Sequence, residues 1–264
     1  GTYLPLSDTH VYSKPSANIL QMGARRYPET YGGVLPNIHK NAGDEYAVFN
    51  LSDVELHEQR PMSLRETCYP AWKTAILRHG AGQNADTLTL AFNPHGGHRH
   101  ADNLALFYDD GGRTALGDLG YMGDMPVNRW IRSTASHNLV IVDGAEQKFS
   151  GRKTTFEFMA TSPLASVVEA SSTAYAQCSD YRRRVVLVKT GENDTFAIDI
   201  FNVAGGKEHR YRVFSELASS DASEGRLVVD GVPLSEEAPL PQVGNSLASA
   251  DIFGLRDVRS GTPG

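Results

Sequence analysis

The stretch "NLALFYDDGGRTALGDLG", residues 103–120, places two alternating apolar segments on either side of an Asp-Asp-Gly-Gly sequence. Successive side chains of a strand point to opposite faces, so apolar residues at every second position indicate a half-buried strand. Glycine pairs accept the positive φ angles that tight hairpin turns require. The stretch therefore predicts an antiparallel β-hairpin.

Further segments with this strand pattern follow one another along the chain. They are "KTAILRHG" (73–80), "DTLTLAFN" (86–93), "NLVIVDG" (138–144), "TFEFMATS" (155–162), "RRRVVLVKT" (182–190), "TFAIDIFNV" (195–203), "HRYRVFSE" (209–216) and "RLVVDG" (226–231). No helical pattern separates them, which favours antiparallel pairing. We therefore expect a mainly β chain that forms a large antiparallel β-sandwich. The run of three arginines at 182–184 alternates between faces, and we interpret it as a solvated edge.

The amino-terminal part has a different pattern. "PSANILQMGARRYP" (15–28) predicts a helix with Ser16 as N-cap and Pro28 as its stop. Residues 29–60 are rich in turn formers, so we divide the chain into residues 1–60 and a β domain at 61–264. The chain has no initiator Met and closes soon after a strand-like segment, so we expect an internal fragment whose sandwich is truncated at the C-terminus.

Composition excludes some classes of function. The net charge of −6 gives no general attraction to nucleic acid. No apolar run reaches the roughly 18 residues that a membrane helix needs. Two cysteines, Cys68 and Cys178, are compatible with free thiols or with one disulfide, and spacing alone does not decide between them.

The stretch "NPHGGHRHADN" (93–103) concentrates three of the nine histidines of the chain. If it is a strand, His98 and His100 point to the same face and present two imidazoles to one ion. Asp118 ends the predicted hairpin, which returns it toward His100, and His137 begins the next apolar strand. One metal ion explains this combination. The alternative is a polar patch at the rim of the sandwich, in which each histidine is hydrogen-bonded separately.

The same residues resemble a known family. "GGHRHADNLALFYDDGGRTALGDLGY" (96–121) and "RWIRSTASHNLVIVDG" (129–144) resemble the core signature of the heparinase II/III-like polysaccharide lyases, which include heparin, heparan sulfate and alginate lyases. "CYPAWKTAILR" (68–78) resembles the strand that opens the β domain of that family. The resemblance covers most of residues 60–215. It implies a β-supersandwich that follows an (α/α) toroid, so the helix near residues 16–26 would be a remnant of that toroid.

The resemblance also implies roles for individual residues. It assigns a structural zinc ion to His100, Asp118 and His137, and it makes His98 the catalytic residue that faces the substrate. The catalytic tyrosine of the family lies on the toroid, which we expect in cis but outside this chain. We therefore expect the fragment alone to be inactive or nearly so.

Lyases of this kind cleave a uronic-acid-containing polysaccharide, of alginate or glycosaminoglycan type, by β-elimination. The reaction needs a neutralised carboxylate, a base for the C5 proton and an acid for the leaving oxygen. An acidic substrate also needs cations, and five arginines surround the signature: Arg99, Arg113, Arg129, Arg132 and Arg152. Among residues near the ligands we assign Tyr121 and Arg132 to substrate binding. Trp130 either stacks on a sugar ring or fills the sandwich.

Two other functions remain open at this point. Cupin-like enzymes also present His-x-His from a β-barrel, but they place a glutamate a few residues later, whereas Leu104, Ala105 and Leu106 stand here. A non-catalytic carbohydrate-binding sandwich is the third possibility. The resemblance implies a periplasmic or secreted protein with an acidic polysaccharide or oligosaccharide as its partner, without nucleic acid or membrane.

Overall fold

The computed structural model describes residues 22–24, 26–31, 65–81, 84–93, 100–120, 128–192 and 194–213. The strands are β1 (Thr67–Tyr69), β2 (Thr74–His79), β3 (Asp86–Ala91), β4 (Ala105–Asp110), β5 (Arg113–Leu116), β6 (Val140–Val142), β7 (Thr154–Thr161), β8 (Ala165–Ser172), β9 (Cys178–Lys189), β10 (Thr195–Gly205) and β11 (His209–Tyr211). The helices are α2 (Pro28–Tyr31), α5 (Asn128–Ile131) and the 3-10 turn η2 (Thr134–Ser136). Within these residues no helix is long and apolar enough to cross a membrane.

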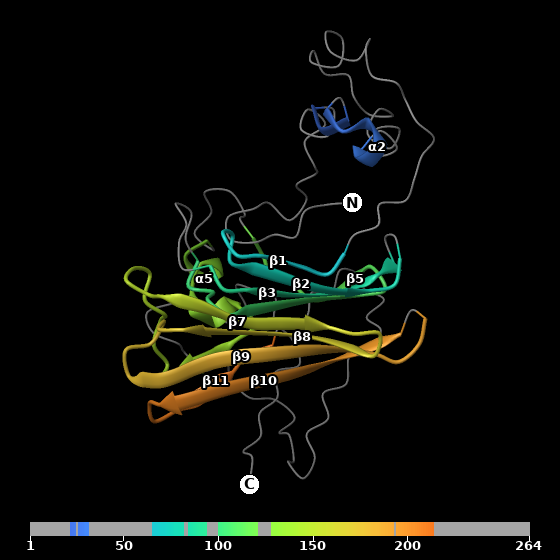
Figure 1. Ribbon diagram of the computed structural model, residues 1–264. Helices are drawn as coiled ribbons and strands as arrows, with labels where there is room; N and C mark the ends of the chain where they lie inside the picture. Colours follow the sequence, from blue (N-terminus) through green and yellow to red (C-terminus); the bar gives the residue numbers. More distant parts are fainter. Residues whose placement is uncertain are drawn as a thin grey trace, which may run out of the picture.

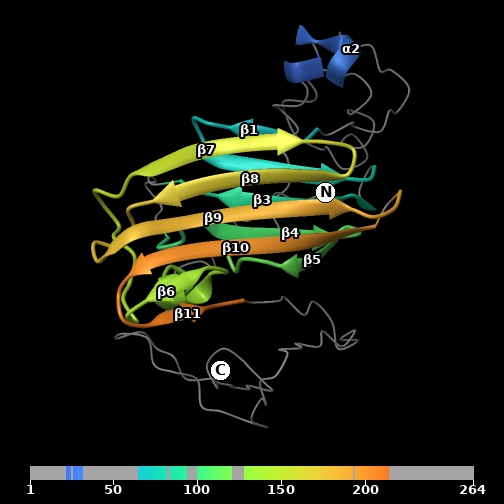
Figure 2. The same cartoon turned by 60° about the horizontal axis from the view of Figure 1, so that its bottom comes forward.

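Two antiparallel sheets form the layers of a sandwich (Figure 1). One has the order β1-β2-β3-β4-β5 and the other the order β10-β9-β8-β7. A third, two-stranded sheet pairs β11 with β6 beside β10 (Figure 2). The predicted antiparallel β-sandwich is therefore confirmed. The opening hairpin is also confirmed, since β4 pairs with β5 around Gly111 and Gly112, which both have positive φ.

Alternation along the strands builds the core between the layers. In the five-stranded sheet, Ala75, Leu90 and Leu106 lie in one row across three strands, and all three are buried. In the facing sheet, Val168 pairs with Val185, and both are fully buried. Burial of these apolar side chains is the main force that holds the two sheets together.

Arg183 corrects the interpretation of residues 182–184 as a solvated edge. The strand β9 lies inside its sheet, between β10 and β8, and its odd-numbered residues from Tyr181 to Leu187 face the core. The Arg183 side chain is consequently fully buried. Its Nε and Nη2 donate to the two carboxylate oxygens of Asp199 at 2.9 and 2.6 Å. Arg182 and Arg184, which point to the other face, pair with Glu169.

The remaining nitrogen of Arg183 joins the two layers. Nη1 donates to the carbonyl of Leu104 at 2.7 Å and to that of Asn138 at 2.5 Å. Leu104 precedes β4 in the opposite sheet and has a φ of +66°, while Asn138 precedes β6. A buried guanidinium is tolerated because every side of it is paired or hydrogen-bonded.

Other expectations had mixed outcomes. Two strands were missing from the prediction, β1 and β8, although β8 lies in the middle of its sheet.

Residues 22–24 and 26 are helical, but Pro28 opens α2 as well as ending the helix before it. Cys68 and Cys178 are free, half-buried thiols. Residues 1–21, 32–64 and 214–264 lie outside the described residues, so the boundary at residue 60 and the strand at 226–231 stay predictions.

Replacing Arg183 with Leu should destabilise the protein by about 3–5 kcal/mol, because it removes the only cation paired with Asp199 among the described residues and the guanidinium donor to two carbonyls. Urea unfolding measures the loss. The double variant Arg183→Leu/Asp199→Leu should recover only part of it, since the Leu104 carbonyl still lacks the guanidinium donor and the Asn138 carbonyl keeps only its bond from the N–H of Leu106. Arg210→Leu, which removes a partly exposed pair with Glu208, is the control and should cost far less. If Arg183→Leu and Arg210→Leu lost the same free energy of unfolding, Arg183 would not be the buried link between the sheets that we describe.

Candidate metal centre

His100, Asp118 and His137 converge on one buried point of the fold. Each offers a ligand atom, and these atoms lie within 4.8 Å of one another. Nδ1 of His100 lies 3.1 Å from Nε2 of His137, which lies 3.2 Å from Oδ2 of Asp118. None of the three residues is more than 6% exposed.

The spacing of these atoms fits a tetrahedral zinc ion. With zinc–ligand distances near 2.0–2.2 Å, two ligands of a tetrahedral centre stand roughly 3.4 Å apart. Two of the three separations, 3.1 Å from His100 to His137 and 3.2 Å from His137 to Asp118, are close to that value, and all three atoms lie within 4.8 Å of one another. Two imidazoles and one carboxylate also form a ligand set that zinc accepts, so the residues present fit this metal.

Three different segments carry the three side chains. His100 lies in the loop between β3 and β4, and Asp118 follows the end of β5. His137 is the C-cap of η2, just before β6. The hairpin therefore returns Asp118 toward His100 as predicted. His100 itself does not belong to a strand, because a turn at Asp102–Ala105, with a positive φ at Leu104, separates it from β4. His98 lies outside the described residues, so the shared face of the two histidines stays a prediction.

Backbone groups orient two of the ligands. Nδ1–H of His137 donates to the carbonyl of Ser133 at 2.8 Å, so its Nε2 faces the other two residues. Oδ1 of Asp118 accepts the backbone N–H of Gly120 at 2.6 Å, and Oδ2 is left to face His137. Hydrogen bonds of this kind fix the ring tautomer and orient a metal ligand.

Asn138 ties the segments of Asp118 and His137 together. It follows His137 directly, and its Nδ2 donates to the carbonyls of Gly117 at 3.0 Å and Leu106 at 3.1 Å. Gly117 precedes Asp118, so a single amide holds two ligand segments in register. Sequence reasoning assigned no role to Asn138, although its position inside the His-Asn signature was a usable signal.

Two more buried residues hold the loop of His100. Arg152 donates to the His100 carbonyl at 3.3 Å, which gives this arginine a structural place rather than the substrate contact considered from sequence. Gln147 accepts the N–H of Asn103 at 2.8 Å and donates to its carbonyl at 2.9 Å. These partners lie 44–52 residues away in sequence, so no local pattern could have revealed them.

The electrostatics of the cluster favour a charged His137 when no metal competes. Burial lowers the pKa of His137, but the Asp118 carboxylate, through its charge and hydrogen bond, raises it by more, and the result is about 9. A proton and a metal ion would therefore compete for Nε2 of His137.

Of the residues predicted to contact the substrate, the structure describes two and leaves two outside the described residues. His98 and Tyr121 lie outside the described residues, so their roles stay predictions. Arg132 is exposed, and its carbonyl accepts the N–H of Ala101, which places it beside His100. Trp130, on α5, is 4% exposed, so its ring is buried in this structure and not open to a sugar.

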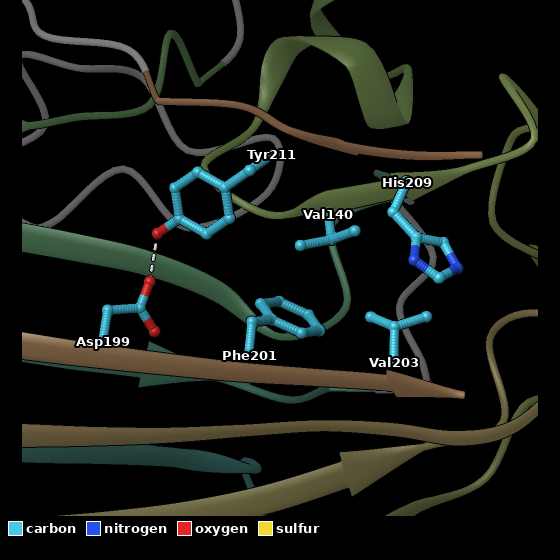
Figure 3. A pocket seen from close by; sticks show the side chains of 6 residues that line it. All are labelled: Val140, Asp199, Phe201, Val203, His209 and Tyr211. Carbon is cyan, nitrogen blue, oxygen red and sulfur yellow. Dashed lines mark hydrogen bonds between the residues drawn. The ribbon is translucent and has the colours of Figure 1, made fainter. Parts of the chain in front are cut away.

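A separate hollow of about 320 Å³ lies between β10 and the β6–β11 pair (Figure 3). Its lining residues are Val140, Asp199, Phe201, Val203, His209 and Tyr211. Tyr211 donates to Asp199, which Arg183 also holds, and Nε2–H of His209 donates to the Gly205 carbonyl at 2.8 Å. Its polar groups are thus engaged within the fold, and we place the candidate site at the metal cluster.

Residues 68–231 match the family described as heparinase II/III-like, C-terminal. The chain belongs to this family. The matched segment covers more than half of the chain and includes all three residues of the cluster. No curated protein matches the chain.

Solved structures agree on the fold. Heparan sulfate lyase HepC from Pedobacter heparinus has a TM-score of 0.50 at 17% identity, over 75% of this chain and 29% of that one. A heparinase III has a TM-score of 0.53 at 16% identity, over 82% of this chain and 33% of that one. The chain therefore spans about a third of the length of these lyases, and at this identity the likeness shows the fold alone.

The stability of the chain in a metal chelator should fall as pH rises from about 6.5 to about 9. The folded-state pKa of His137, about 9, exceeds its ordinary value of 6.5, so its contribution is full below 6.5 and is lost toward 9. Asp118→Asn removes the charge that raises this pKa and should flatten the slope. Thermal unfolding across this range measures the effect, with His209→Gln as a control that keeps the wild-type slope. Parallel curves for wild type and Asp118→Asn would refute the assignment.

Proposed function

We propose that this chain is the zinc-containing β-sandwich domain of a polysaccharide lyase that cleaves a uronic-acid-containing polysaccharide by β-elimination. Membership of the heparinase II/III-like family supports the lyase class. The buried cluster of His100, Asp118 and His137 is the observation that carries the proposal, because a sandwich has no structural need for two imidazoles and a carboxylate in mutual contact. A cupin-like enzyme loses its support, since the chain belongs to a different family.

The proposed zinc ion has a structural function. His100, Asp118 and His137 would hold it, and the three come from separate loops at one end of the sandwich. When bound, the ion supplies cross-linking of these loops rather than bond chemistry. Its cluster is at most 6% exposed, which suits a closed structural site better than an open catalytic one.

The proposed chemistry acts on a substrate bound beside this cluster. Abstraction of the C5 proton of a uronate requires a base and a neutralised carboxylate. We assign proton transfer or carboxylate binding to His98, two residues before His100, and carboxylate binding to exposed Arg132. A helical toroid in cis would supply the catalytic tyrosine. The proposed setting is the periplasm or the outside of the cell, and the substrate is of alginate or glycosaminoglycan type.

The chain should bind stoichiometric zinc after purification with metal supplied, and His100→Ala should lose it. The reason is that two remaining protein ligands hold zinc far less tightly than three. Metal analysis by mass spectrometry measures the zinc content. His209→Ala, which alters an exposed histidine outside the cluster, serves as the control and should retain zinc. Full zinc occupancy in His100→Ala would exclude the proposed ligand set.

The natural full-length protein should release unsaturated uronate products from alginate or a glycosaminoglycan, detected by their ultraviolet absorbance, while this chain alone should not. His98→Ala in the full-length protein should lower kcat by roughly 10²–10⁴-fold, the usual contribution of acid–base catalysis, and keep its zinc. A neutral glucan is the substrate control. If no acidic polysaccharide yields product with the full-length protein, the proposed lyase function is wrong.

A further inference from the structure

Two aromatic side chains stand side by side on the surface at the turn between β1 and β2. Tyr69 ends β1 and is 47% exposed, and Trp72 lies in the turn and is 74% exposed. Their ring centroids are 5.8 Å apart, with 35° between the ring planes. Trp72 is the most exposed of the described aromatic side chains, and no packing role explains a tryptophan that is mostly in water.

The turn that carries this pair is held in a defined conformation. The N–H of Trp72 donates to the carbonyl of Tyr69 at 3.0 Å, and the Lys73 carbonyl accepts the N–H of Phe92 at 2.8 Å. Lys73 has a φ of +55°, which is unfavourable for a residue with a side chain. Strained backbone of this kind persists where the surrounding structure fixes it, and it clusters at binding sites. The rings are therefore presented by a fixed turn.

The turn lies at the same end of the sheet as the metal cluster. Phe92, which bonds to Lys73, is followed by Asn93, whose carbonyl accepts from Arg152 at 3.4 Å. The same nitrogen of Arg152 donates to the His100 carbonyl. In the sheet, β2 and β3 lie between β1 and β4. Neighbouring strands are about 4.8 Å apart, so the distance from β1 to β4 at this end of the sheet is roughly 15 Å. A polysaccharide bound at the cluster would need several sugar units to reach the turn.

We propose that Tyr69 and Trp72 form a stacking subsite for a sugar unit of the acidic polysaccharide that lies several units away from the cleaved bond. The inference rests on the proposed function, because the polysaccharide at the cluster is its ligand. Aromatic rings bind the apolar C–H face of a pyranose without requiring a fixed pattern of hydroxyl groups. Lys73, the next residue, adds a positive charge that suits a carboxylate or a sulfate.

The chain offers a direct optical test, because it contains two tryptophans and only Trp72 is exposed, whereas Trp130 is 4% exposed. In a Trp130→Phe variant of the full-length protein, tryptophan emission comes from Trp72 and from any tryptophan outside this chain. The double variant Trp72→Phe/Trp130→Phe measures the second contribution, which is then subtracted. Acrylamide should quench Trp72 strongly without ligand, and long oligosaccharides of alginate or heparan sulfate should protect it. A neutral glucan oligosaccharide of equal length is the ligand control.

Kinetics supply a second test. In the full-length protein Trp72→Ala should raise KM for long oligosaccharides by roughly tenfold and leave kcat and the KM of the shortest cleaved substrates unchanged. Phe196→Ala is the matched control, since Phe196 is 48% exposed on β10 of the other sheet, and it should change neither constant.

Three results would overturn the subsite: Trp72 is already shielded in the ligand-free full-length protein, acidic oligosaccharides give no protection, or Trp72→Ala leaves every KM unchanged. Failure of the proposed function is recognised separately, by the absence of product from every acidic polysaccharide. In that case protection of Trp72 by an acidic oligosaccharide still supports the subsite, and its absence still excludes it.

Discussion

The buried guanidinium of Arg183 is the constraint on which the arrangement of this sandwich depends. It originates in one sheet, pairs with Asp199 on the neighbouring strand, and reaches across to the carbonyls of Leu104 and Asn138. These two carbonyls lie next to the loops that carry His100 and His137. Because a buried charge is stable only when its donors are satisfied, the two sheets and both loops must adopt one relative position. The packing of the two sheets therefore helps to set the positions of the loops that carry the buried cluster.

The cluster shows how such a constraint is transmitted to a site. Arg183 fixes the carbonyl of Asn138, and the side chain of Asn138 fixes Gly117 beside Asp118. The carbonyl of Ser133 then selects which nitrogen of His137 faces the cluster. Each step is a hydrogen bond from a buried group to the backbone, which limits rotation as well as position. These interactions hold the three side chains of the cluster close together without a metal, so an ion that binds there would meet side chains that are already oriented.

The sequence predicted the parts of this structure that depend on local pattern. Alternation and turn residues identify the hairpin at 103–120. Spacing singled out His98, His100, Asp118 and His137 as candidates, and the family resemblance reduced them to the three residues that meet in the cluster. The pattern failed at β8, "ASVVEASS", whose inward positions other than Val168 carry small residues such as Ser166 and Ala170, and whose middle is charged Glu169. It failed at Arg183 for a related reason. Charge in a strand usually indicates solvent, and the partners that permit burial lie up to 79 residues away.

The two tryptophans show that sequence patterns also predict functional surfaces incompletely. Trp130 lies within the family signature and is buried, whereas Trp72 lies outside its core and is exposed. The solvent exposure of a side chain depends on which elements pack over it. A family signature records only the order of residue types along the chain, so it does not contain this information. The core of the signature therefore includes the three residues of the buried cluster and omits the exposed pair at the β1–β2 turn. If distant sugar units contact the β1–β2 turn, enzymes with the same histidine and aspartate pattern can differ in the chain length they prefer through residues that the pattern does not include.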